Sequence, residues 1–129
     1  MTAQVDHLVI AASTLADGVA WCEHTLGITP GPGGEHPLMG THNRLFSIAT
    51  AQHPNAYLEI IAITKEAACA RKQADKRWFD LDNKTLQRSL KQNGPQLIHF
   101  VASTPHALPA IEALASLGID RGELLVLRA

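Results

Sequence analysis

The chain has 129 residues, 46% of them hydrophobic, and its 11 basic and 12 acidic residues nearly cancel. This length suits one domain with its own hydrophobic core. With the charges nearly balanced, no basic patch predicts nucleic-acid binding, and no apolar run approaches the roughly 20 residues of a membrane span. The start of the sequence lacks a basic segment followed by an apolar core, and the two cysteines, Cys22 and Cys69, form no CxxC motif. These features predict a cytoplasmic protein with free thiols and with neither a membrane nor a nucleic-acid partner.

The first predicted strand, residues 5–10, carries a histidine among apolar side chains. The segment is partly β-branched and small residues follow it, as expected for a short buried strand. Because side chains alternate across a strand, His7 shares a face with two valines. The same arrangement returns around His99 in residues 96–102.

An amphipathic helix is predicted over residues 14–26, with Ser13 or Thr14 as its N-cap and Gly27 at its end. Its expected apolar stripe consists of Leu15, Val19, Cys22 and Leu26. The next stretch, residues 29–43, is rich in glycine and proline and predicts a long loop, a kind of segment that is often functional in compact domains. This loop contains three candidates for substrate binding: His36, His42 and Asn43.

Two strands are predicted next, over residues 44–49 and 57–63, and the short link between them favours an antiparallel hairpin. Glu59 lies near the middle of the second strand. An isolated buried carboxylate is costly unless it is paired, so Glu59 favours a partner cation or a metal. The alternative is a solvent-facing residue on a half-exposed strand.

The rest of the chain predicts a charged connector and a shorter version of the first half. Residues 66–76 suit a surface helix, and a second short helix is expected after a cap at Asp82 or Asn83. The second histidine strand is followed by a helix that Gly118 closes and by a last strand, residues 123–127.

The two halves share one order of elements. His7 and His99 are each followed by an Ala-Ser-Thr sequence, a helix and a Leu-Gly-Ile sequence at similar spacing. Two copies of one supersecondary unit are the interpretation we favour over a chance similarity of two βα units. The first copy predicts βαβββ, whereas the second has room for βαβ.

With these motifs the chain resembles the vicinal oxygen chelate superfamily, which contains glyoxalase I, extradiol dioxygenases, epimerases and bleomycin-resistance proteins. More narrowly, it looks like the glyoxalase-like domain subgroup over most of residues 5–102. The segments that carry this resemblance are VDHLV at 5–9, GEHP at 34–37, MGTHN at 39–43, YLEII at 57–61 and RWF at 77–79.

The resemblance implies an α+β fold in which paired βαβββ modules form a cupped, curved mixed sheet, with an incomplete second module. It implies a single domain over residues 1–129, composed of a first module at 5–63, a connector with short helices at 64–96 and a partial second module at 97–129. It also implies a divalent metal in the cup, held by His7, Glu59 and His99. The family's fourth ligand, an acid on the last strand of the second module, has no counterpart, since Glu123 lies on an earlier strand.

These residues also make chemical sense without the resemblance. Imidazole and carboxylate ligands suit Zn²⁺, Fe²⁺, Mn²⁺ or Ni²⁺, and a metal with open positions holds two substrate oxygens and stabilises an enolate or alkoxide. For His7 and His99 the alternative is a hydrogen-bonded core histidine. Arg44 is a weaker candidate for binding an acidic substrate. The alternative for Arg44, as for His36, His42 and Asn43, is a solvated position on the surface.

Three functions stay open on the sequence alone. The first is a metal-dependent lyase, isomerase or dioxygenase acting on a small oxygenated molecule. The second is a metal-free binding or sequestering protein of the same fold, as bleomycin-resistance proteins are, and the third is a catalytically degenerate fragment that serves as a dimerisation scaffold. Because the short second module predicts exposed sheet edges, we expect a homodimer.

Overall fold

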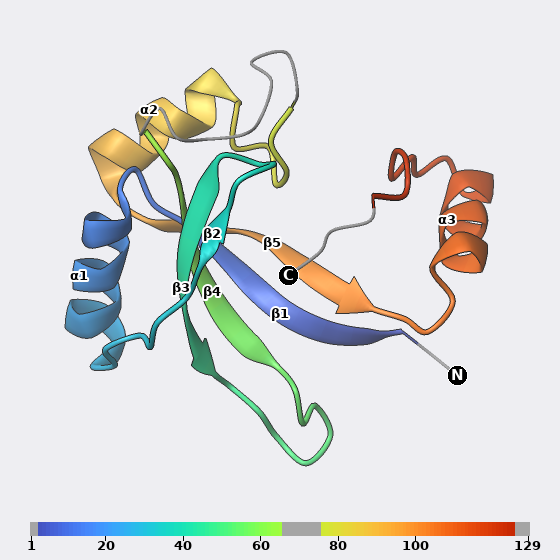
Figure 1. Cartoon of the computed structure of the whole chain (residues 1–129), viewed down its shortest axis with the longest axis horizontal. Helices are drawn as coiled ribbons and strands as arrows, with labels where there is room; N and C mark the ends of the chain where they lie inside the picture. Colours follow the sequence, from blue (N-terminus) through green and yellow to red (C-terminus); the bar gives the residue numbers. More distant parts are fainter. Residues whose placement is uncertain (1–2, 66–75, 126–129) are drawn as a thin grey trace.

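The computed structural model describes residues 3–65 and 76–125 of the chain (Figure 1). The elements in these residues are, in order, β1 (Gln4–Ala11), α1 (Leu15–Leu26), β2 (Glu35–His36), β3 (Thr41–Ser47), β4 (Tyr57–Ile63), α2 (Lys84–Asn93), β5 (Gln96–Ser103) and α3 (Ala107–Ser116). In Figure 1, α1 lies beside the sheet and α3 projects beyond β5. This is the α+β class that the sequence predicts.

The strands form one curved mixed sheet in the order β2-β3-β4-β1-β5. β1 runs parallel to β4, with Val9 opposite Glu59, and antiparallel to β5, with Val9 opposite His99. β3 and β4 form the predicted antiparallel pair. The elements from β1 to β4 are therefore a βαβββ module, and β5 and α3 are the described part of the second unit.

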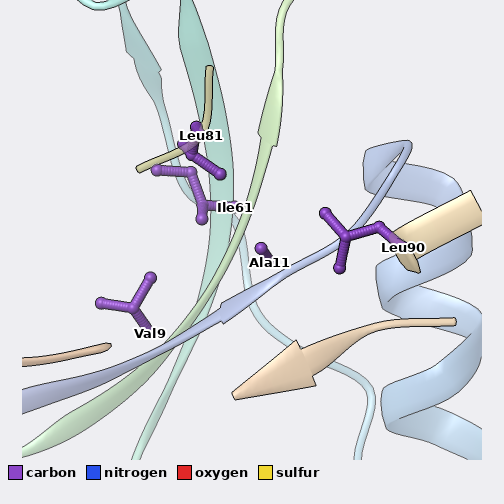
Figure 2. Close-up of a cluster of buried hydrophobic side chains, with 5 residues drawn as sticks. All are labelled: Val9, Ala11, Ile61, Leu81 and Leu90. Atoms are coloured by element: carbon purple, nitrogen blue, oxygen red, sulfur yellow. The ribbon is translucent and has the colours of Figure 1, made fainter. Parts of the chain in front are cut away.

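Different segments cover the two faces of the sheet. One face packs against α1 through a cluster of four buried residues: Ile10, Cys22, Leu58 and Ile60. The opposite face has its own buried cluster: Val9, Ala11, Ile61, Leu81 and Leu90. Figure 2 shows Leu81 against Ile61, and Leu90 reaching from α2 toward Ala11. Because side chains alternate, this second face, called the cup face below, also carries His7 and Glu59.

A glycine brings helix α1 close to the sheet. Thr14 accepts a hydrogen bond from a backbone N–H of the first turn, and Gly27 ends the helix in the left-handed conformation (φ 68°), both as predicted. A Cβ on Gly18 would overlap with Cγ2 of Ile60, so a larger residue would push the helix away. The predicted apolar stripe is partly wrong, because the helix turns Gly18 toward the sheet and leaves Leu26 43% exposed.

The starts of β3 and α2 can also be compared with the predictions. β3 begins at Thr41 instead of residue 44, because residues 41–43 pair with residues 61–63 of β4. The end of the predicted loop is therefore a strand. Of the two predicted caps of α2, Asn83 is used: its side chain accepts a hydrogen bond from the backbone N–H of Leu86.

The predicted last strand is not formed where it can be checked. Residues 123–125 are exposed and irregular, and residues 126–127 lie outside the described residues. The helix predicted at 66–76 also lies outside them, except for Lys76, as does Cys69. In the described part of the chain, no helix is long and apolar enough to cross a membrane.

Candidate functional site

Strands β1 to β4 bring a connected set of polar side chains together on the cup face. We call this set the cup network; its members are Asp6, His7, His36, Thr41, Asn43 and Glu59. Four of them are almost fully enclosed, with exposed fractions of 8% for His7, 1% for Thr41, 9% for Asn43 and 4% for Glu59. Buried polar groups of this kind are stable when they bond one another.

His7 lies between two carboxylates. Its Nδ1 is 2.6 Å from Oδ1 of Asp6, and its Nε2 is 3.4 Å from Oε1 of Glu59. Burial lowers the pKa of His7, but the hydrogen bonds and negative charges of Glu59 and Asp6 outweigh burial and raise this pKa above its ordinary value of 6.5. The imidazole stacks on Tyr57, with ring centroids 4.3 Å apart. Burial, with the charges of Glu59 and Asp6, raises the pKa of Tyr57 to about 12, so its phenol stays neutral.

Asn43 holds the other oxygen of Glu59. Its Nδ2 donates to Oε2 of Glu59 at 2.5 Å, and its Oδ1 accepts a hydrogen bond from the backbone N–H of Gly34 at 2.8 Å. The carboxylate therefore has partners on both oxygens, which offsets the cost of its burial. The alternative of a solvent-facing Glu59 is wrong.

The glycine-rich loop approaches Asn43 so closely that a side chain does not fit. A Cβ on Gly33 would overlap with the backbone oxygen and Oδ1 of Asn43. Arg44 fastens the same loop, since its Nε and Nη2 donate to the backbone oxygens of Gly31 and Pro30 at 2.8 and 2.7 Å. A glycine at position 33 thus allows the loop to approach and position Asn43. Arg44 is half-buried against the loop.

His36 is a neutral member of the network. Its Nδ1 is 2.9 Å from Oγ1 of Thr41, and its Nε2 is 3.3 Å from Nδ2 of Asn43. Burial lowers the pKa of His36, and the attraction of Glu59 does not restore it. A neutral ring with its proton on Nδ1 fits both contacts, because Nε2 is then an acceptor. His42 lies on the opposite face of β3 from Asn43, since neighbouring residues of a strand alternate.

His99 lies outside the cup network. Its Nε2 is 2.9 Å from Oδ2 of Asp80, and its ring centroid is 5.8 Å from that of Phe79. Both partners belong to residues 77–82, called the strap below. Phe79 and Asp80 have positive φ values of 58° and 59°, which are uncommon for residues other than glycine. At its other side the strap contacts the network, because the ring of Trp78 lies edge-on to that of His36 at 5.0 Å.

The network partly fits a divalent cation. It offers two converging donor atoms, Nε2 of His7 and Oε1 of Glu59, and each residue has an outer partner, Asp6 or Asn43, as is usual around metals. In residues 3–65 and 76–125, however, no three His, Cys, Asp or Glu side chains are grouped so as to hold a metal ion. Within these residues no lysine or arginine pairs with Asp6 or Glu59, so two carboxylates face one imidazole.

Sequence reasoning missed three residues of this region. Asp6 directly precedes His7, and strict alternation assigns it to the opposite face; the register of β1 and β5 shifts between Val5 and His7, where Asp6 lies. Thr41 was hidden in the predicted loop. No sequence pattern points to Asp80, because the segment around it has neither helix nor strand periodicity.

The raised pKa of His7 predicts the dependence of stability on pH. Because the folded protein holds this proton more tightly than the unfolded chain, protonation stabilises the fold. The contribution is complete below about pH 6.5 and is lost as the pH rises through the folded pKa. Between about pH 6 and pH 9 we expect the free energy of unfolding, measured with urea on metal-free protein, to fall more for the wild type than for His7→Gln. An NMR titration that places the pKa of His7 below 6.5 would contradict this.

The sequence matches the family profile of the glyoxalase-like domain over residues 5–128, which confirms the resemblance. A comparison with curated protein sequences finds no significant match. Similar solved structures include the methylmalonyl-CoA epimerase of Streptomyces coelicolor in complex with 2-nitronate-propionyl-CoA, with 17% identity, a TM-score of 0.58, and coverage of 89% of this chain and 71% of that chain.

Two further solved structures have the same fold at a comparable level of similarity. A methylmalonyl-CoA epimerase in complex with methylmalonyl-CoA and NH4+ is 17% identical, with a TM-score of 0.60 over 92% of this chain and 72% of that chain. A hypothetical protein from Bacillus halodurans C-125 is 12% identical, with a TM-score of 0.59 over 92% and 70% of the two chains. At these identities the similarity shows a shared fold.

Proposed function

Because this chain belongs to the glyoxalase-like domain family of the vicinal oxygen chelate superfamily, we propose that it is an enzyme that uses a divalent metal to isomerise a small oxygenated molecule. Isomerisation is preferred over lyase and dioxygenase chemistry because solved structures with this fold include methylmalonyl-CoA epimerases. The observation that carries the proposal is the buried pair of donor atoms, Nε2 of His7 and Oε1 of Glu59, 3.4 Å apart on the cup face.

The proposed metal ligands are His7, Glu59 and His99, the last after it leaves Asp80. Bound Zn²⁺, Fe²⁺, Mn²⁺ or Ni²⁺ supplies Lewis acidity toward substrate oxygens. Two carboxylates around one imidazole favour the entry of a cation, and binding requires His7 to give up its extra proton. Asp6 and Asn43 keep the donor atoms of His7 and Glu59 oriented.

The substrate-binding role falls best on His36 and Trp78. The indole N–H of Trp78 is buried and has no hydrogen-bond partner in the described residues, so a substrate oxygen would satisfy it. His36 lies beside it as a neutral ring. Asn43 is already bound to Glu59 and Gly34 and acts as a positioning residue, and His42 lies away from this face.

A metal-free binding protein is the second candidate. The contact between His99 and Asp80 favours this second candidate, because it engages His99, the third proposed metal ligand. In such a protein the cup network would bind a small molecule through hydrogen bonds alone.

Metal analysis by mass spectrometry on untagged protein separates the two candidates. We expect near-stoichiometric metal in the wild type and in His24→Ala, a control histidine on the surface, and no metal in His7→Ala. Asp80→Asn should bind metal at least as tightly as the wild type, since it weakens the hold on His99. A wild-type protein that takes up none of added Zn²⁺, Ni²⁺ or Mn²⁺ would reject the enzyme and leave the binding protein.

We also propose that the protein forms a homodimer through β5. This strand lies at one edge of the described sheet, and its Leu97 and Phe100 are 63% and 65% exposed. Apolar side chains on a free edge favour association. Size-exclusion chromatography with light scattering at micromolar concentration should show a dimer for the wild type and for Leu38→Glu, a control at another exposed leucine, and a monomer for Phe100→Glu. A wild-type monomer would refute the dimer.

A further inference from the structure

Helix α2 carries an unfavourable charge pattern on its outer face. Lys84, Arg88 and Lys91 recur at helical spacing and form one stripe, whereas Leu86 and Leu90 face the hydrophobic core. Like charges four positions apart destabilise a helix, and a cation in the first turn opposes the helix dipole. The first turn contains no acidic residue to compensate. Lys91 lies in the last turn, where a cation complements the helix dipole, so the cost in local stability comes from Lys84 and Arg88. A ligand that needs these charges would explain that cost.

The stripe lines a hollow in the surface. This α2 hollow has a volume of about 350 Å³, and its lining consists of Ile63, Leu81, Asp82, Lys84, Gln87, Arg88 and Lys91. It therefore combines three cations with one acid and an apolar part. A volume of this size accommodates a small organic molecule.

The cations of the hollow keep their charge available. Asp82 is engaged with Arg77: one carboxylate oxygen is 2.7 Å from Nη1, and the other accepts the backbone N–H at 2.7 Å. In the described part of the chain, Lys84, Arg88 and Lys91 form no ion pair with any acid. The hollow is therefore positively charged.

The hollow is separate from the cup network, with which it shares no residue. Ile63 lies four positions after Glu59 on β4, and a strand rises by about 3.3 Å per residue, so the two positions are roughly 13 Å apart. Occupation of one site therefore does not block the other by direct contact.

We propose that the α2 hollow binds a small organic molecule that carries a phosphate group. Phosphate brings up to two negative charges and several acceptor oxygens, which match three cations better than a single carboxylate does. Arg88 offers paired donors suited to phosphate oxygens, while the two lysines act as point charges. Ile63, which is partly exposed, provides the contact for an apolar part of the ligand.

Titration calorimetry with phenyl phosphate tests this proposal. We expect binding by the wild type, and an affinity lower by roughly tenfold or more in the double variant Arg88→Gln, Lys91→Gln, because charge-assisted contacts are lost. Arg121→Gln, a control at an exposed arginine outside the hollow, should bind as the wild type does. Glu59→Gln should also bind normally, which separates this site from the cup network.

The double variant also has an internal folding control. Removing two like charges relieves repulsion but also removes Lys91 from the last turn, where a cation complements the helix dipole, so its thermal midpoint without ligand should stay close to that of the wild type. Phenol, which lacks the phosphate, should bind much more weakly than phenyl phosphate. Equal affinity of the wild type and the double variant for phenyl phosphate, no binding by the wild type, or equally strong binding of phenol would overturn the proposal.

Discussion

Glu59→Gln is expected to reduce the affinity for a divalent metal by at least about 100-fold, because losing even an outer partner of a metal ligand costs roughly 10–100-fold. Glutamine has the shape of glutamate and keeps an oxygen for the Nδ2 of Asn43, but it removes the negative charge beside His7. The free energy of unfolding should fall by about 1–3 kcal/mol, the usual range for a lost charged hydrogen bond. Metal titration and urea denaturation measure the two effects.

The same variant tests the electrostatic link between Glu59 and His7. Glu59 is the main source of the raised pKa of His7, so NMR titration of Glu59→Gln should give a lower pKa for His7 than in the wild type. Glu112→Gln, on the exposed α3, is the matched control and should leave metal affinity and this pKa unchanged. An unchanged metal affinity in Glu59→Gln would remove Glu59 from the proposed ligand set.

The sequence was most informative where strands have a strict period. The apolar pattern alone predicts that His7 and Glu59 each lie in the middle of a buried strand, and both side chains are buried. Their meeting depends on the parallel pairing of β1 and β4, which is a property of the whole module. The order of elements predicted the module, and the family resemblance implied a curved mixed sheet, but neither specified this pairing.

Long-range pairing explains what the sequence concealed. Residues 41–43 follow a run of glycine and proline that predicts a loop, but their backbone pairs with β4 and makes them a strand. Asn43 therefore became a buried partner of Glu59 where a loop residue was expected. The contact of His99 with Asp80 comes from the strap, where Phe79 and Asp80 have positive φ, a conformation that few residues other than glycine adopt and that no sequence pattern predicted.

Gly33→Ala should damage the cup network although Gly33 is not part of it. The new Cβ would overlap with the backbone oxygen and Oδ1 of Asn43, so either the loop or Asn43 must move. Overpacking of this kind costs about 1–3 kcal/mol in the free energy of unfolding. A displaced Asn43 also loses its hold on Glu59, so metal affinity should fall by about 10–100-fold.

Gly34→Ala is the matched control, because it adds the same methyl group one residue away in a position where nothing lies within 4 Å. This variant should unfold at the same urea concentration as the wild type or slightly higher, since alanine restricts the unfolded chain. Comparing metal titration and urea denaturation of the two variants isolates the clash at Asn43 from the general effect of losing a loop glycine. Equal behaviour of the two alanine variants would mean that the close approach of Gly33 does not position Asn43, and the role of the glycine-rich loop in ordering Glu59 would have to be abandoned.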